Sequence, residues 1–240
     1  MNIMWFSSGV SSFIAAYFCR GELDAIIYTH IEDQHPDSLR FNADCELELG
    51  GKITQLQSQY YINVEDVCLR RNFINSPHGA QCTVKLKKEV RKRWEYEHPG
   101  KHTYFWGLDY SEREKLRAER IVDSMPVFEH RFPLIEQGLI KEDAHALCKR
   151  LGIKRPAMYD LGYHNNNCIA CIKGGKGYFN KIRRDFPDAF AARAKMERKI
   201  GASCIKGCFL DELDPDAGRH DPPITEDCGI MCELNLLKEE

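Results

Sequence analysis

Residues 2–20 of the chain read NIMWFSSGVSSFIAAYFCR, and this stretch decides the fold. Its first part, Asn2–Ser7, is a short apolar run typical of a buried strand, and Ser11–Arg20 has the apolar spacing of a helix. Between them lies the turn Ser8–Ser12, in which Gly9 permits a tight bend and a close approach of the backbone to a ligand. The stretch therefore predicts the first strand–turn–helix unit of an α/β domain.

The alternation of strand and helix patterns continues along the chain. Apolar runs predict further strands at 25–31, 53–56 and 102–106, and amphipathic spacing predicts helices at 36–48, 64–72, 83–97, 111–123, 141–151, 177–186 and 187–200. Because strands that alternate with helices form parallel sheets with right-handed crossovers, we expect an α/β fold with a doubly wound, mainly parallel sheet. From about Pro133 the pattern becomes helical and irregular, so we expect a core over residues 1–135 and a Cys-rich extension over residues 136–240 packed on it.

Composition is that of an ordinary globular chain. Of the 240 residues 43% are hydrophobic, which is enough for one full core, and 29% are charged with a formal net charge of −2. This balance creates no general attraction for nucleic acid, so any such contact needs a local basic patch. No apolar run approaches the roughly 18 residues of a membrane span, and the N-terminus lacks a basic leader, so we expect no membrane contact and a cytoplasmic location.

The turn after the first strand is a candidate phosphate loop. The N-terminus of the following helix supplies backbone N–H groups and the positive end of the helix dipole, both of which favour anions. Serine hydroxyls add further donors. A serine-rich helix cap with no ligand is the structural alternative. The candidate residues are Ser7, Ser8, Gly9, Val10, Ser11 and Ser12.

The chain has 11 cysteines, and in a reducing compartment these favour metal binding or redox chemistry over disulfides. Four of them stand alone in helix-like segments and are expected to pack in the core: Cys19, Cys45, Cys68 and Cys148. The spacing Cys168-x-x-Cys171 lets two thiolates reach one metal ion. Pairs at Cys204/Cys208 and Cys228/Cys232 follow, and Cys82 stands before a basic helix. Buried or free thiols are the alternative for each pair.

Basic residues crowd the helix that follows Cys82. They are Lys85, Lys87, Lys88, Arg91, Lys92 and Arg93, and a second basic loop carries Lys173 and Lys176. Lys85 lies on the same side of the helix as the Cys82 turn and is a candidate to contact phosphate or sulfate. A solvated charged face is the alternative, and a local nucleic-acid contact is a further one.

Several short motifs, in order, resemble the phosphoadenylyl-sulfate (PAPS) reductase family of the adenine nucleotide alpha hydrolase, or PP-loop ATP pyrophosphatase, superfamily. Ser7–Ser12 resembles the family's modified phosphate loop, with Ser11 at the place of its Asp. Gly107-Leu108-Asp109 followed by Glu112 and Arg113 resembles its Gly-x-Arg-x-x-Glu element, with Asp109 at the place of the Arg. Pro133-Leu134, a helix at 141–152, Tyr159-x-x-Gly162-Tyr163 and Cys168-x-x-Cys171 follow in the family's order.

The resemblance implies an adenine nucleotide, either ATP or an adenylyl sulfate, at Ser7–Ser12 and Gly107, with Mg²⁺ where ATP is used. It implies catalytic roles for Lys85, Arg113 and Cys228. It also implies a [4Fe–4S] cluster on Cys82, Cys168 and Cys171, completed by Cys228 or Cys232, and zinc on late cysteines is the alternative. Cys228 has two rival roles, as nucleophile and as metal ligand.

Two reactions follow from this resemblance. One is reduction of an adenylyl sulfate, with a thiol reductant such as thioredoxin as partner. The other is ATP-dependent sulfur transfer through an adenylated intermediate, for which a nucleic acid is a candidate acceptor. The absence of the loop Asp favours reduction. A catalytically degenerate module that senses nucleotide or contacts nucleic acid is the alternative function.

Overall fold

The computed structural model describes residues 1–76 and 79–221, which divide into two compact units. Unit 1 consists of residues 1–30, 36–56 and 91–161, and unit 2 consists of residues 31–35, 57–90 and 162 onward. This division does not follow the single boundary expected at residue 135. Residues 57–90 lie between two stretches of unit 1 in the sequence yet belong with the later part of the chain.

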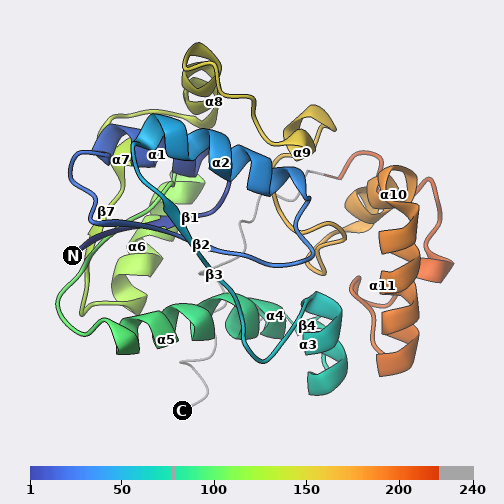
Figure 1. Cartoon of the computed structure of the whole chain (residues 1–240). Coiled ribbons are helices and arrows are strands. Elements are labelled where there is room, and N and C mark those ends of the chain that lie inside the picture. The colour runs from blue at the N-terminus through green and yellow to red at the C-terminus, as the bar shows by residue number, and fades with distance from the viewer. Residues whose placement is uncertain (77–78, 222–240) are drawn as a thin grey trace. The chain divides into compact units, whose positions relative to one another are not determined.

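Unit 1 is built on a five-stranded parallel sheet, which confirms the expected α/β class (Figure 1). Its strands are β1 (Asn2–Phe6), β2 (Ala25–Thr29), β3 (Ile53–Leu56), β6 (Thr103–Phe105) and β7 (Glu129–Arg131). The order across the sheet is β3-β2-β1-β6-β7. The chain adds strands on one side of β1 and later returns to add β6 and β7 on the other. The direction of strand addition therefore reverses between β1 and β6.

Helices cover both faces of this sheet, as a doubly wound fold requires. In Figure 1, α1 and α2 lie on one face and α6 lies on the other. The helices are α1 (Val10–Cys19), α2 (Asp37–Leu49), α5 (Glu89–Glu97, in unit 1 from Arg91), α6 (Glu112–Ser124), α7 (Pro133–Glu136), α8 (Lys141–Arg150) and α9 (Ala157–Asp160). Helix α1 is the most enclosed, because Phe13, Ile14, Ala15 and Ala16 are all fully buried. Its alanines let it approach the sheet while α7 and α8 pack against it.

Unit 2 is mainly helical. It contains α3 (Val64–Arg71), a hairpin of β4 (Asn75–Ser76) and β5 (Gly79–Ala80), α4 (Gln81–Thr83), a π-helical turn (Val84–Lys88), α10 (Lys176–Asp185), α11 (Pro187–Ile200) and a 3₁₀ turn (Leu210–Glu212). Helix α11 packs against both α10 and α3. Phe179, Ile182 and Met196 are fully buried and form the centre of this packing.

The four isolated cysteines are core residues, as expected. Cys19, Cys45 and Cys148 belong to the apolar core of unit 1, and Cys68 is fully buried in unit 2. Burial raises the pKa of the Cys19, Cys68 and Cys148 thiols to about 11. These thiols stay protonated at neutral pH and serve as small apolar side chains.

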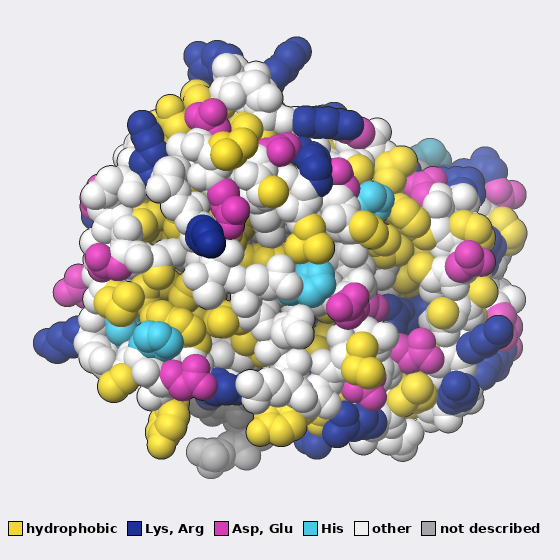
Figure 2. Space-filling view, viewed as in Figure 1, with side chains coloured by type: hydrophobic (Ala, Val, Ile, Leu, Met, Phe, Trp, Pro, Cys, Tyr) yellow, Lys and Arg dark blue, Asp and Glu magenta, His cyan; other side chains and the backbone are white. Residues whose placement is uncertain are grey.

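The surface carries charges of both signs. On the face shown in Figure 2, Lys and Arg side chains are mixed with Asp and Glu side chains. In residues 1–76 and 79–221, no helix is long and apolar enough to cross a bilayer.

Candidate functional site

The candidate phosphate loop lies at the point where strand order reverses. Ser7 directly follows β1, and Gly107 comes two residues after β6. The two strands are parallel neighbours, so their carboxyl ends meet at one edge of the sheet. In open α/β sheets ligands bind outside the carboxyl ends of the strands at this reversal.

Gly107 packs directly on the first turn of α1. A Cβ atom at Gly107 would lie 2.4 Å from Ser12 Cα and 2.6 Å from Ser12 N. Any larger residue would collide with backbone atoms, which cannot rotate aside. The structure thus brings Gly107 against the loop, where the motif resemblance implied it.

The hydroxyl of Ser12 closes the loop from inside. Its Oγ donates to Gly9 O at 2.8 Å and accepts from the Ser7 amide at 3.2 Å, from the Ser7 hydroxyl at 3.0 Å and from the Gly9 amide at 3.3 Å. Ser12 therefore shapes the loop, and its hydroxyl already has partners within it.

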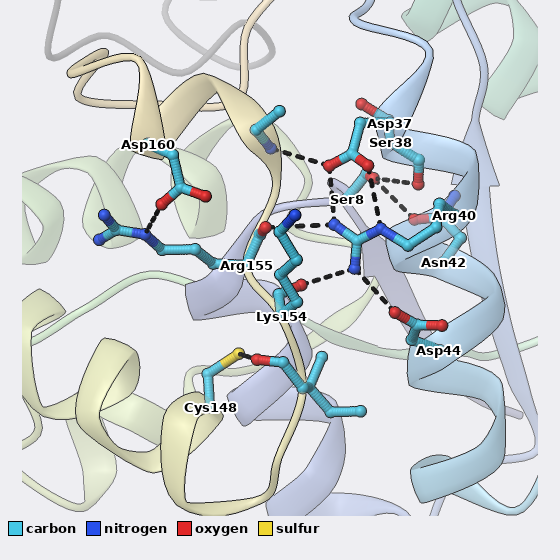
Figure 3. Close-up of polar contacts among 12 residues, drawn as sticks. Ser8, Asp37, Ser38, Arg40, Asn42, Asp44, Cys148, Lys154, Arg155 and Asp160 are labelled. Atoms are coloured by element: carbon cyan, nitrogen blue, oxygen red, sulfur yellow. Dashed lines mark hydrogen bonds and ion pairs between the residues drawn. The ribbon is translucent and has the colours of Figure 1, made fainter.

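Ser8 has a left-handed backbone, with φ of 59°. This conformation is costly for a residue other than glycine, and it persists where side-chain contacts fix it. The Ser8 hydroxyl is fully buried and donates to Asn42 Oδ1 at 2.6 Å and to Ser38 O at 3.2 Å, both on α2. The serine is thus an anchor between the loop and α2, as Figure 3 shows.

The first turn of α1 is arranged to receive an anion. It has no acidic side chain, and its first intrahelical bond runs from Phe13 N to Gly9 O at 3.1 Å. The N–H groups of Val10, Ser11 and Ser12 precede that bond and have no acceptor within the helix. They lie at the positive end of the helix dipole, so they can bind phosphate oxygen.

An ionic network on α2 holds the segment that leads into α9 (Figure 3). Asp37 binds Arg40 through both carboxylate oxygens, at 3.0 and 2.7 Å, and accepts from Ala157 N at 2.8 Å. Arg40 also donates to the carbonyls of Lys154 at 2.7 Å and Arg155 at 3.1 Å. The hydrogen bonds to Asp37 hold the pKa of Arg40 above its usual range. The start of α2 thereby fixes residues 154–157.

This fixed segment places Tyr159 beside the loop. The Tyr159 hydroxyl is the atom nearest to the position of a Cβ on Gly9, at 3.2 Å. The ring packs edge-on against His145, with 4.7 Å between ring centroids. The loop therefore has a phenol hydroxyl on one side and Gly107 on another.

Arg113 and Lys85, the two candidate catalytic cations, belong to different units. Arg113 is exposed on α6 of unit 1. Lys85 lies in unit 2 and forms an ion pair with Glu89 one helical turn later. Asp109, at the place of the family's Arg, accepts a hydrogen bond from Ser111 N at 3.0 Å and shapes the turn before α6.

In unit 2, Cys82, Cys168 and Cys171 line one small pocket. All three are at least 93% buried, and the other lining residues are Ile31, Val64, Thr83, Lys87 and Ile172. The structure thus places the isolated Cys82 with the Cys-x-x-Cys pair, far apart as they are in sequence.

Several contacts hold the Cys168–Cys171 turn in shape. The Tyr178 hydroxyl donates to Cys168 O at 3.1 Å and accepts from Cys171 N at 2.9 Å. Burial holds the pKa of Tyr178 well above its usual value, so the phenol keeps the proton it donates. Ala170, with φ of 52°, offers its carbonyl to Arg193 Nε at 3.1 Å. The turn is therefore fixed before any ligand arrives.

Arg193 is itself fixed by a buried ion pair with Asp33. Arg193 Nη2 lies 3.1 Å from Asp33 Oδ1, and the two side chains are 6% and 13% exposed. Asp33 also accepts from Val64 N at 2.7 Å, and its carbonyl accepts from Ile169 N at 2.7 Å. Asp33 thus connects the turn to α3 and α11 through its carboxylate and its backbone carbonyl.

The described residues alone do not form a metal centre. Within residues 1–76 and 79–221, no three His, Cys, Asp or Glu side chains gather closely enough to hold one metal ion. A metal on Cys168 and Cys171 would need ligands from elsewhere. The expected partners, Cys228 and Cys232, lie outside the described residues, as does the nucleophile role of Cys228.

Comparisons with known proteins include a relative in sequence and a similar solved structure. No family model matches the chain. An uncharacterized 37.8 kDa protein in the gpa 5′ region of Escherichia phage 186 is 26% identical over 152 residues, which cover 59% of this chain and 44% of that protein. The chain thus matches less than half the length of that relative. A solved structure, the phosphate complex of PAPS reductase from Candida auris, is similar with a TM-score of 0.49 and 12% identity, covering 68% of this chain and 79% of that one.

Replacing Gly107 tests the contact between β6 and the loop. We expect Gly107→Ala to destabilise the protein by about 1–3 kcal/mol, because the new methyl group must displace the backbone of Ser12. Gly51→Ala is the matched control, since nothing lies within 4 Å of a Cβ there. Urea unfolding measures both. Equal stability of the two variants would contradict the close approach.

Proposed function

We propose that unit 1 binds the phosphate groups of an adenine nucleotide at Ser7–Ser12. The observation that carries this proposal is the position of the loop at the reversal of strand order, with Gly107 pressed against it. The geometry supports phosphate, and the motif resemblance supports adenine. The proposed donors are the N–H groups of Val10, Ser11 and Ser12, with Tyr159 beside them.

We further propose that the protein is an enzyme of sulfur metabolism that reduces an adenylyl sulfate. A thiolate attacks the sulfate sulfur, breaks its bond to the phosphate oxygen of the nucleotide and leaves an S-sulfonate on cysteine. A second thiol then attacks that cysteine sulfur, releases sulfite and closes a disulfide, which accounts for the two electrons. Cys228 is the proposed nucleophile, and a thioredoxin-like protein is the proposed reductant.

The proposed substrate is negatively charged, so cationic side chains would stabilise it. The sulfate and phosphate groups carry negative charge that increases on the leaving nucleotide during attack. Lys85 and Arg113 are proposed to neutralise it. For Lys85 this requires exchange of its ion pair with Glu89 for the substrate.

ATP-dependent sulfur transfer is the second form of the proposal. It requires Mg²⁺ near the phosphate chain, and carboxylates are the usual protein ligands of Mg²⁺. The first turn of α1 has no acidic residue, and Ser11 stands where the family has Asp. This favours reduction. The lack of an acidic residue in this turn also supports the alternative function, a catalytically degenerate nucleotide-sensing module that contacts nucleic acid.

Gly9→Asp tests the phosphate loop. We expect nucleotide affinity to fall by at least about tenfold, because a carboxylate at the helix N-terminus repels phosphate and occupies its place. Gly21→Asp puts the same charge at the other end of α1, where nothing lies within 4 Å, and should leave affinity unchanged. Calorimetric titration with ATP and adenylyl sulfates measures both. The proposal fails if the two variants bind alike.

Cys228→Ser separates the two roles of that residue. As nucleophile, its loss should abolish sulfite release from adenylyl sulfates while nucleotide affinity and metal content stay constant. As metal ligand, its loss should also remove iron or zinc from anaerobically purified protein, as should Cys168→Ser. We expect the nucleophile result. Cys208→Ser is the control, and full turnover by Cys228→Ser would contradict the reductase mechanism.

A further inference from the structure

Unit 2 contains a second cavity, which shares no lining residue with the small pocket lined by Cys82, Cys168 and Cys171. Its empty space is about 860 Å³, including the part open to solvent. One face of α10 forms much of its wall, through Gly177, Asn180, Lys181 and Arg184, and Tyr163 and Asp221 also line it. None of these residues has a role in the function proposed above.

A carboxylate already sits at the N-terminus of α10. Gly177 N donates to Asp221 Oδ2 at 3.3 Å. The turn that carries Asp221 reaches the helix because two glycines meet there: a Cβ on Gly177 would lie 2.1 Å from Gly218 O. The first turn of this ten-residue helix is therefore an anion position, and a side chain of the protein occupies it.

Three cationic side chains line the cavity, and one of them, Arg219, forms an ion pair with Asp216. Lys181, Arg184 and Arg219 line it, against the single carboxylate of Asp221. Lys181 pairs with Asp185 at 2.8 Å and lies 4.6 Å from the centre of the Tyr163 ring. Arg184 is exposed, and among the described residues it has no hydrogen-bond or ion-pair partner. An anionic ligand would therefore meet a cation that makes no hydrogen bond or ion pair with the described residues.

The buried side chain of Asn180 indicates that the ligand also has a hydrogen-bond donor. This side chain is 5% exposed, and its Nδ2 donates to Asp214 O and Ala217 O, both at 2.8 Å. These two bonds fix the amide orientation and leave Oδ1 as a buried acceptor. Among the described residues Oδ1 has no donor. Such an atom is costly unless a hydroxyl or amine reaches it.

We propose that this cavity binds a ribose phosphate unit. The phosphate takes the place of the Asp221 carboxylate at the start of α10, Arg184 neutralises it, and a ribose hydroxyl donates to Asn180 Oδ1. Asn180 is three residues after Gly177, which is about 4.5 Å along the helix axis. A sugar phosphate spans that separation. The unit is the same in a free metabolite and in a nucleic acid, and the chemistry named here is common to both.

The test uses the full-length Gly9→Asp variant, so that the loop of unit 1 does not contribute. Ribose 5-phosphate is titrated calorimetrically, with inorganic phosphate as the probe that lacks a hydroxyl-bearing sugar. Asp221→Asn should strengthen ribose 5-phosphate binding about threefold to tenfold, because it removes the competing charge. Arg184→Gln should weaken it about threefold or more. Both residues are exposed, so neither change threatens the fold.

Lys206→Gln removes an exposed charge from unit 2 outside the cavity and should change nothing. Tighter binding of a single-stranded oligoribonucleotide than of ribose 5-phosphate, with the same response to Arg184→Gln, identifies nucleic acid as the source of the unit. Equal affinity in all these variants, no preference over inorganic phosphate, or no binding by Asp221→Asn at millimolar ligand would overturn the proposal. Because Gly9→Asp is present throughout, failure of the loop proposal leaves these results unaffected.

Discussion

The close approach of Gly107 to the first turn of α1 is the constraint on which the candidate site depends. The chain leaving β6 passes within contact distance of Ser12, so the loop after β1 has a backbone wall on one side. On α2, Asn42 and Ser38 hold Ser8 in a left-handed conformation. The resulting loop lies at the edge of the sheet where strand order reverses.

A second layer of contacts makes this geometry rigid. Arg40 on α2 joins two carboxylates to two backbone carbonyls of the segment before α9. Hydrogen bonds that involve a charged group are the stronger kind, and five of them act through the one guanidinium of Arg40. The position of Tyr159 next to Gly9 follows from this connection. In unit 2, Asp33 and Arg193 act in the same way on the Cys168–Cys171 turn.

Local sequence patterns were sufficient to predict the strands and helices whose formation depends on the residues of their own segment. The strands near residues 2, 25, 53 and 103 and the helices that follow them were predicted, because apolar runs and amphipathic spacing are properties of one segment. β7 was not predicted, since Glu129–Arg131 carries three polar residues and has no apolar run. It exists because β6 and the residue that follows it offer backbone partners, among them Trp106 N, which donates to Arg131 O at 3.0 Å. The hairpin of β4 and β5 was not predicted, because its strands have two residues each.

The assignment of segments to units depends on contacts that sequence order does not reveal. Residues 57–90 continue the alternation of elements without a break in composition, yet they belong with the chain after residue 162. The pair Asp33–Arg193 spans 160 positions. For the site, the order of glycine and serine residues predicted the turn after β1, and the motif resemblance implied Gly107. The roles of Asn42 and Arg40 could not be predicted, because each is one polar residue on an amphipathic helix. The pairing of Lys85 with Glu89 was not predicted, although a spacing of four residues on a helix permits it.

The central claim is that the amides at the start of α1 bind a nucleotide phosphate. Hydrogen–deuterium exchange of the full chain, with and without adenosine 5′-phosphosulfate, tests it most directly. The account predicts slower exchange at the amides of Ser8–Ser12 and in the segment around Gly107 when nucleotide is bound. Unchanged exchange at both places under saturating nucleotide, with protection confined to other parts of the chain, would contradict it.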